Sequence, residues 1–249
     1  MRKHDGVRLT QLALPLRLEE HAAFDSLVDG HNGAAFAHVR TLARAPAGGD
    51  LLWLWGARGC GKSHVLQAAC READRAGKRA MYLPFGDSPD VGPELLAGLD
   101  ALDFLALDGL EDVAGRPEWE AGLFRVLNAF QSRERCLLMA AAGAPAAVGF
   151  ALPDLASRAA GALVYRVHPL GEHDQLRALS LHARRRGIEL DEAAGRFLQS
   201  RVPRDMHALC AWLRRLDTES LAAQRRITIP FIRESLDADG VGTEARGAE

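Results

Sequence analysis

The stretch "GARGCGKS", residues 56–63, restricts the possible folds of this 249-residue chain more than any other segment. It fits the pattern G-x-x-x-x-G-K-[ST], in which glycines let backbone amides curl around phosphate oxygens and a lysine neutralises their charge. The apolar run "LLWLW" precedes the pattern and "SHVLQAACREADRAG" follows it, which predicts a strand, a loop and a helix in the required order. The sequence therefore predicts a phosphate-binding loop within an α/β domain.

The residues of this loop are candidate nucleotide ligands. Lys62 is predicted to contact the β- and γ-phosphates, and the Ser63 hydroxyl to bind Mg²⁺. The apolar run "FLALD" ends in Asp108, and in phosphate-loop proteins such an acid holds the magnesium indirectly, through water. A capping or turn aspartate is the alternative interpretation. The residues predicted here to bind nucleotide are Gly56, Ala57, Arg58, Gly59, Cys60, Gly61, Lys62, Ser63, His64 and Asp108.

Short apolar runs alternate with helical patterns up to residue 169. Further strands are expected in "RAMYLPFGD", "LDFLALDGLED", "CLLMAAAG" and "ALVYRVHPL". This alternation predicts a five-stranded parallel sheet covered on both faces. Beyond residue 169 the apolar spacing is helical throughout, which predicts a small all-helical domain. The expected organisation is a flexible tail at 1–20, an α/β phosphate-loop domain at 21–169, a helical domain at 170–236 and a disordered polar tail at 237–249.

Composition excludes several classes of protein. The formal net charge of −2 gives no global basic field for nucleic acid. The longest apolar runs are far shorter than the roughly 20 residues that span a membrane. The four cysteines form no CxxC pair, as expected of reduced thiols rather than of a disulfide framework or a zinc site. The sequence predicts a cytoplasmic protein with no membrane segment.

Several stretches together resemble the Hda family of DnaA-related regulators of bacterial replication initiation. They are "QLALPL", "LWGARGCGKSHVLQAAC", "LPDLASR", "RGIELDEAAGRFL" and "LAAQRRITIPFIRESL", and the resemblance runs from about Gln11 to Leu236. It implies an AAA+ module, that is, an α/β nucleotide domain with a helical lid, which binds ADP or ATP with Mg²⁺. It also implies DnaA as a partner. Sequence-specific DNA binding is not expected, because only a polar tail follows Leu236 where DnaA has a helix-turn-helix. Whether the chain forms a homo-oligomer stays open.

The apolar peptide "QLALPL" resembles the segment with which this family docks on the DNA polymerase sliding clamp, the β subunit. By that resemblance the clamp-binding residues are Gln11, Leu12, Leu14, Pro15 and Leu16. A peptide captured in an extended form would place its leucines in an apolar pocket, and Pro15 limits the entropy lost on binding. The alternative is that the peptide packs on the core of its own chain.

Two features predict that a bound nucleotide is turned over poorly. AAA+ ATPases usually follow the magnesium aspartate with a second acid that polarises the attacking water, and that position is Gly109 in this chain. Glu111 and Asp112 are nearby but displaced along the sequence. The fourth strand, where such enzymes carry a polar residue that senses the γ-phosphate, offers only Ala140, Ala141 and Ala142. The sequence predicts a nucleotide binder with weak or absent intrinsic ATPase activity.

The helical domain departs from its relatives at one predicted nucleotide contact. In "VPRDMHALC", His207 stands where AAA+ relatives carry an arginine that contacts the phosphates. Histidine becomes charged only at mildly acidic pH, so it is a poor phosphate ligand near neutrality. Arg204, three residues earlier and on roughly the same helix face, is the alternative ligand.

The stretch "DLASR" ends in Arg158, for which two roles are open. It could pair with Asp154 at helical spacing, worth about 0.3–0.5 kcal/mol. By the family resemblance it is instead an arginine finger that reaches a partner's ATP, an effect of about 10³–10⁵ in turnover. The second role predicts a clamp-dependent DNA replication inhibitor, which stimulates hydrolysis of DnaA-bound ATP. The alternatives are a helicase-loader ATPase of the DnaC type and a clamp adaptor without a role in chemistry.

Overall fold

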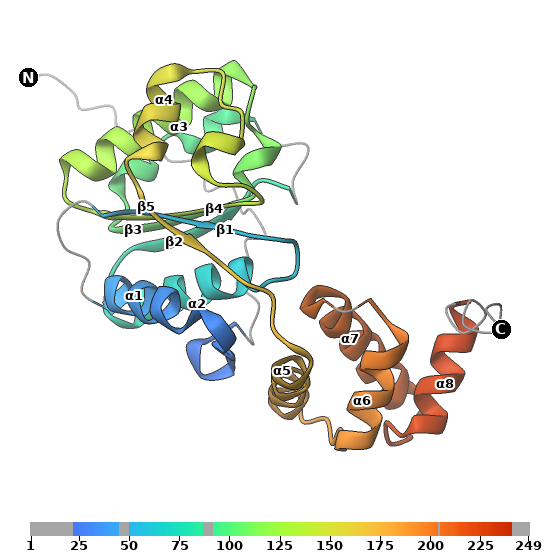
Figure 1. Cartoon of the computed structure of the whole chain (residues 1–249). Helices are drawn as coiled ribbons and strands as arrows, with labels where there is room; N and C mark the ends of the chain where they lie inside the picture. The colour runs from blue at the N-terminus through green and yellow to red at the C-terminus, as the bar shows by residue number, and fades with distance from the viewer. Residues whose placement is uncertain (1–21, 45–49, 87–91, 204, 241–249) are drawn as a thin grey trace, which may run out of the picture.

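The computed structural model describes residues 22–44, 50–86, 92–203 and 205–240, and consists of a layered α/β part followed by a group of helices (Figure 1). The strands are β1 (Leu51–Trp55), β2 (Ala80–Pro84), β3 (Phe104–Asp108), β4 (Cys136–Ala141) and β5 (Leu163–Arg166). All neighbouring strands run parallel, in the order β2-β3-β4-β1-β5. The five-stranded parallel sheet predicted from the sequence is confirmed.

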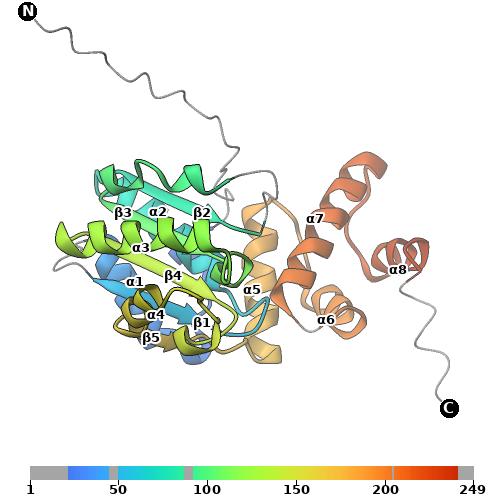
Figure 2. The ribbon, with the colours of Figure 1, turned by 90° about the horizontal axis from the view of Figure 1, so that it is seen from above.

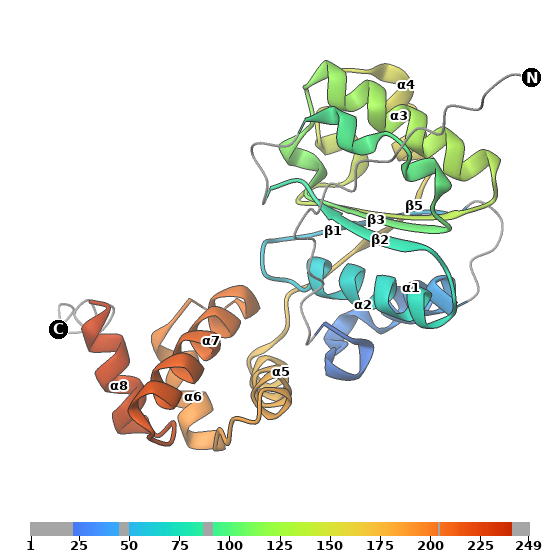
Figure 3. The same ribbon diagram turned by 180° about the vertical axis from the view of Figure 1, so that it is seen from behind.

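Helices cover both faces of the sheet, α1 (Gly33–Arg44) and α2 (Lys62–Arg75) on one side and α3 (Pro117–Ser132) and α4 (Pro153–Ala160) on the other (Figures 1 and 3). Because side chains alternate along a strand, each strand contributes side chains to an apolar core on either face of the sheet. Trp53 of β1 belongs to the core under α3 and α4, whereas Leu52 and Leu54 belong to the core under α1 and α2. This double burial explains why the strands read as continuous apolar runs.

Short 3₁₀ helices occupy several connections: Phe24–Ser26, Gly30–Asn32, Pro93–Leu96, Leu99–Ala101, Leu110–Asp112 and Pro145–Ala147. In the four described ranges of the chain, no helix has the length and apolar character needed to cross a bilayer.

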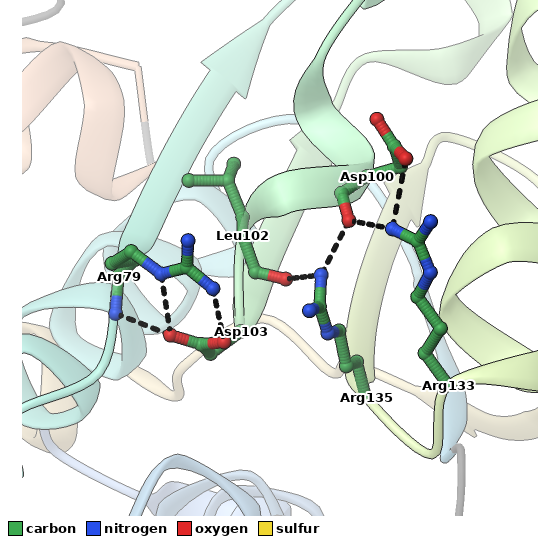
Figure 4. A network of polar contacts seen from close by, with 6 residues as sticks. All are labelled: Arg79, Asp100, Leu102, Asp103, Arg133 and Arg135. Carbon is green, nitrogen blue, oxygen red and sulfur yellow. Dashed lines mark hydrogen bonds and ion pairs between the residues drawn. The ribbon is translucent and has the colours of Figure 1, made fainter.

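Three arginines bind the segment that leads into the amino end of β3, the end of the strand opposite to Asp108 (Figure 4). The Arg79 guanidinium donates to both carboxylate oxygens of Asp103, at 3.0 and 2.9 Å. Arg133 and Arg135 both donate to the main-chain carbonyl of Asp100. These contacts join the segment that precedes β3 to the residues that precede β2 and β4.

The second part contains α5 (Glu172–Arg185), α6 (Glu192–Arg201), α7 (Met206–Ala223) and α8 (Ile229–Ala238), the last of which ends beyond the expected boundary at residue 236. These helices enclose a core of their own, whose fully buried members include Leu179, Leu198, Leu209, Leu213 and Ile232. Two aspartates begin helices as the sequence pattern favours: the side chain of Asp191 accepts from the amide of Ala194, and that of Asp205 from the amide of Ala208. The predicted small helical lid is confirmed.

The junction between the two parts is held by Asn32 and His168. The Asn32 amide donates to the carbonyl of His168 at 2.9 Å, and the His168 amide donates back to Asn32 Oδ1 at 2.7 Å. Asn32 is buried, so both of these bonds are shielded from water. The chain leaves the sheet through this junction and enters α5, the lid helix nearest to the α/β part (Figure 2).

Candidate functional site

A cavity of about 630 Å³ lies at the carboxyl ends of the strands, between the predicted phosphate loop and the lid. This is where open parallel sheets bind their ligands. The predicted ligands that line it are Arg58, Gly59, Cys60, Gly61, Lys62, Ser63, His64, Asp108 and His207. Gly56 and Ala57 belong to the same loop but do not line the cavity. Arg204 and the peptide at residues 11–16 lie outside the described residues.

The loop is folded tightly around the side chain of Lys62. Its Nζ atom donates to the carbonyls of Gly56 at 2.7 Å and Ala57 at 3.1 Å. A side chain at Gly56 would have its Cβ 2.3 Å from the carbonyl oxygen of Val167, so only glycine fits there. Burial raises the pKa of the Cys60 thiol despite the nearby Lys62 ammonium, so this thiol stays protonated at neutral pH.

Helix α2 starts directly after the loop, and its first turn is suited to an anion. The residue before the helix, Gly61, has a φ of 103° and contributes no side-chain cap. The first amides of a helix have no partner within the helix, and the helix dipole places positive potential there. Together with Lys62, these amides form a cradle that fits the phosphates of a nucleotide.

The lid contributes the opposite wall of the cavity. Gly59 of the loop has a φ of 75°, and a Cβ there would lie 2.9 Å from the Cβ of Asp205, so loop and lid meet at this point. His207 follows in the first turn of α7, and Arg214 lines the cavity further along the same helix. Arg214 was not predicted from the sequence, although its spacing of seven residues from His207 puts both on one helix face.

Asp108 is buried at the end of β3, and its Oδ2 atom accepts a hydrogen bond of 2.8 Å from the hydroxyl of Tyr82. The side chains of Ser63 and Gln67 lie close to the Tyr82 hydroxyl and act to lower its pKa. Burial, followed by the charge of Asp108, raises the pKa of the Tyr82 hydroxyl, which is therefore neutral. A phenol hydroxyl is thus bonded to Asp108 and lies close to Ser63, the two predicted magnesium ligands. As arranged here, the pair does not fit Mg²⁺.

Comparisons with known proteins agree with this architecture. Residues 172–236 match the family model described as "Hda, lid domain". Domain III of the Thermotoga maritima replication initiation protein DnaA is similar over 89% of this chain and 98% of its own length, with a TM-score of 0.77 and 19% sequence identity. Residues 172–236 therefore match an Hda lid domain, and the chain as a whole shares the fold of DnaA domain III.

Two further solved structures share the fold. A replication initiator DnaA bound to AMPPCP and single-stranded DNA has a TM-score of 0.67 and 18% identity, over 90% of this chain and 69% of that one. The Thermotoga maritima RuvB Holliday junction branch migration motor has a TM-score of 0.65 and 15% identity, over 87% of this chain and 72% of that one. At such identities the likeness concerns the AAA+ fold alone.

The acidic side of the cavity differs in its residues from the hydrolytic site described above for AAA+ ATPases. Gly109 follows Asp108 with a φ of 79°, and the chain turns directly into the 3₁₀ helix that carries Glu111 and Asp112. Both of these carboxylates line the cavity and are exposed. From β4 and its end only Ala142 lines it, and a methyl group cannot hydrogen-bond to a phosphate. Weak turnover stays a prediction.

Arg158 lies on α4, in the helical layer on the other face of the sheet, and is not among the residues that line the cavity. Its side chain is exposed, and its Nη1 atom donates to Oε1 of Gln131 on α3. The hydrogen bond found in the structure therefore goes to Gln131 rather than to Asp154, the helical neighbour considered from the sequence.

Glu120, on α3, determines where α4 begins. It is fully buried, and its carboxylate accepts from the amides of Gly115, Ala151 and Leu152 at 2.6, 2.9 and 2.6 Å. The last two amides directly precede α4. Nothing in the sequence indicates this role, because a glutamate in the first turn of an amphipathic helix is normally exposed.

Proposed function

We propose that this chain is a clamp-dependent negative regulator of replication initiation, which stimulates the hydrolysis of DnaA-bound ATP through Arg158. The observation that carries the proposal is the position of Arg158, exposed on α4 and away from the cavity of its own chain. An arginine in that position does not serve the nucleotide of its own chain. It is accessible to the phosphates of a neighbouring AAA+ subunit, and the Hda lid favours DnaA as that neighbour.

The geometry of Arg158 suits this role. A guanidinium has five N–H donors in a planar fork, which matches the oxygens of a phosphoryl group. One nitrogen of Arg158 donates to Gln131, which limits the positions that the side chain takes. Positive charge brought to the transferring phosphoryl group stabilises the transition state and is worth about 10³–10⁵ in turnover in other nucleotide hydrolases.

The chain's own cavity would bind ADP or ATP. The amides at the start of α2 and the ammonium of Lys62 would hold the phosphates, and Arg214 would add charge from the lid. A bound nucleotide supplies anionic phosphates that bridge the loop and the lid. Its role in this proposal is to fix the lid rather than to be consumed.

The test measures hydrolysis of ATP pre-bound to DnaA, with the sliding clamp loaded on DNA. Four forms of the protein are compared: the native chain, Arg158→Ala, a chain that lacks residues 1–16, and the matched control Arg125→Ala. Arg125 is also an exposed arginine, on α3 of the same helical layer. We expect the native chain and Arg125→Ala to stimulate hydrolysis, and Arg158→Ala to lose about 10³-fold or more of the stimulation. The chain without residues 1–16 should lose the part of the stimulation that depends on the clamp.

Each alternative function predicts a different set of hydrolysis results for the four forms. If Arg158→Ala stimulates as well as the native chain, the arginine finger is wrong and a clamp adaptor is favoured. If the chain without residues 1–16 is fully active, the clamp-binding peptide has no role. If no form stimulates hydrolysis but the native chain binds single-stranded DNA and hydrolyses ATP itself, a helicase loader is favoured over a regulator.

A further inference from the structure

The hydroxyl of Tyr82 lies between the two residues that a phosphate-loop protein uses for its magnesium ion. Tyr82 is in the middle of β2, the edge strand beside β3, and lines the cavity. Its hydroxyl donates to Oδ2 of Asp108 at 2.8 Å, and the side chains of Ser63 and Gln67 lie close to it. A single side chain thus lies between helix α2 and the end of strand β3.

The hydrogen-bonding capacity of the Tyr82 hydroxyl explains how its neighbours are arranged. A phenol hydroxyl has one hydrogen and accepts through its oxygen. The hydrogen goes to the Asp108 carboxylate, which can only accept, so the nearby side chains of Ser63 and Gln67 are left with the accepting side of the phenol oxygen. Gln67 lies four residues after Ser63 on α2, so both side chains face β2 and β3. The Asp108 carboxylate therefore already has a neutral hydrogen-bond partner, which lies beside the Ser63 side chain.

Magnesium has different requirements. It binds oxygen ligands at about 2.0–2.1 Å in an octahedron and keeps several of its waters. That shell would have to lie between Ser63 and Asp108, where the phenol hydroxyl is. Moving the phenol away is opposed by packing, because Tyr82 is partly buried against the core under α1 and α2.

We propose that Tyr82 replaces the magnesium ion in this site, so that the chain binds adenine nucleotides independently of divalent cations. The inference rests on the proposed nucleotide binding. It identifies Tyr82 as the residue that sets the cation requirement. The negative charge of the phosphates is then balanced by the protein's own cations, of which Arg58, Lys62 and Arg214 line the cavity.

The test is a titration of the full chain with ADP, once with Mg²⁺ and once with a chelator. The variants are Tyr82→Phe and the control Tyr165→Phe. Tyr165 is the chain's other tyrosine, and its hydroxyl contacts Nδ1 of His38. For the native chain and Tyr165→Phe we expect the same Kd in both buffers, within about twofold. For Tyr82→Phe, which exposes the Asp108 carboxylate to the cation, we expect Mg²⁺ to tighten binding by about tenfold.

A second readout follows the cation directly. The paramagnetic signal of Mn²⁺ is recorded with each chain and saturating ADP, and only Tyr82→Phe should bind Mn²⁺ in excess of the ADP control. If Mg²⁺ tightens ADP binding to the native chain about tenfold, or if the native chain immobilises Mn²⁺ as Tyr82→Phe does, the inference is overturned and nucleotide binding stands. If ADP does not bind in any buffer, the proposed nucleotide site fails and this inference fails with it.

Discussion

Replacing Glu120 by glutamine tests how the helix that carries Arg158 is held in place. The two carboxylate oxygens of Glu120 accept three amide hydrogens within a fully buried environment. Glutamine has nearly the same shape, so its packing is conserved. Only one of its two terminal atoms is an acceptor, however, and the other is an NH₂ group that can only donate.

The expected loss of stability follows from these contacts. The amide oxygen can keep the bonds from Gly115 and Ala151, since both of these go to Oε1. The NH₂ group then faces the amide of Leu152, which replaces a 2.6 Å bond to a carboxylate by two opposed donors. A hydrogen bond to a charged group is worth about 1.5–3 kcal/mol, and an unsatisfied buried donor costs about 1–3 kcal/mol. We therefore expect Glu120→Gln to lower the free energy of unfolding by about 2–4 kcal/mol.

Urea denaturation at neutral pH measures this loss, with Glu118→Gln as the control. Glu118 is an exposed glutamate in the same turn of α3, and its replacement should change stability by less than about 0.5 kcal/mol. Hydrogen exchange at the amides of Ala151 and Leu152 should accelerate only in the Glu120 variant. If Glu120→Gln unfolds at the same urea concentration as the control, the carboxylate does not hold the start of α4 and the reasoning is refuted.

Three further substitutions test the phosphate loop, the lid core and the ion pair before β3. Gly59→Ala adds a Cβ 2.9 Å from that of Asp205 at a φ of 75°, so we expect weaker ADP binding by titration and about 1–3 kcal/mol lower stability. Leu209→Ala removes a fully buried side chain from the lid core and should cost about 2–5 kcal/mol in thermal or urea unfolding. Arg79 lowers the pKa of Asp103 to about 2, so the pair stabilises the fold above the unfolded pKa of about 3.9 and this contribution disappears as the pH falls through 2. Because both side chains are solvent-exposed, Asp103→Asn should cost less than about 1 kcal/mol at pH 7 and nothing below pH 2, as measured by urea unfolding across this range.

The features that the sequence predicted correctly are those encoded by local periodicity. Parallel strands covered on both faces need continuous apolar runs, so "LLWLW", "FLALD" and "CLLMAA" could be recognised without any knowledge of their neighbours. The lid helices could be recognised from apolar spacing in the same way. The phosphate-loop pattern identified a loop that lines the cavity, and nucleotide binding there stays a prediction.

Contacts that depend on the order of the strands could not be predicted. Tyr82 stands in an apolar strand and has the pattern of an ordinary core residue. Its role arises because β2 pairs with β3. This pairing places Tyr82 opposite Ala106, two residues before Asp108 and on the same face of the sheet. Glu120 is a similar case, since its partners come from two separate loops. In both cases the residue can be read from the sequence, but which residues lie beside it in the folded chain cannot.

This cavity differs from a hydrolytic site at several residues, and each difference affects a separate requirement of hydrolysis. Gly109 removes the acid that would polarise water, and Ala142 provides no hydrogen bond to a γ-phosphate. In the proposed role, Tyr82 removes the need for the cation. The cradle of Lys62 and the start of α2 is nevertheless intact. A cavity that keeps its binding groups while its hydrolytic groups are absent or replaced is suited to a permanently bound nucleotide that joins loop and lid. In the proposed function, the arginine that takes part in chemistry is Arg158 on α4, and it acts on the ATP of a partner.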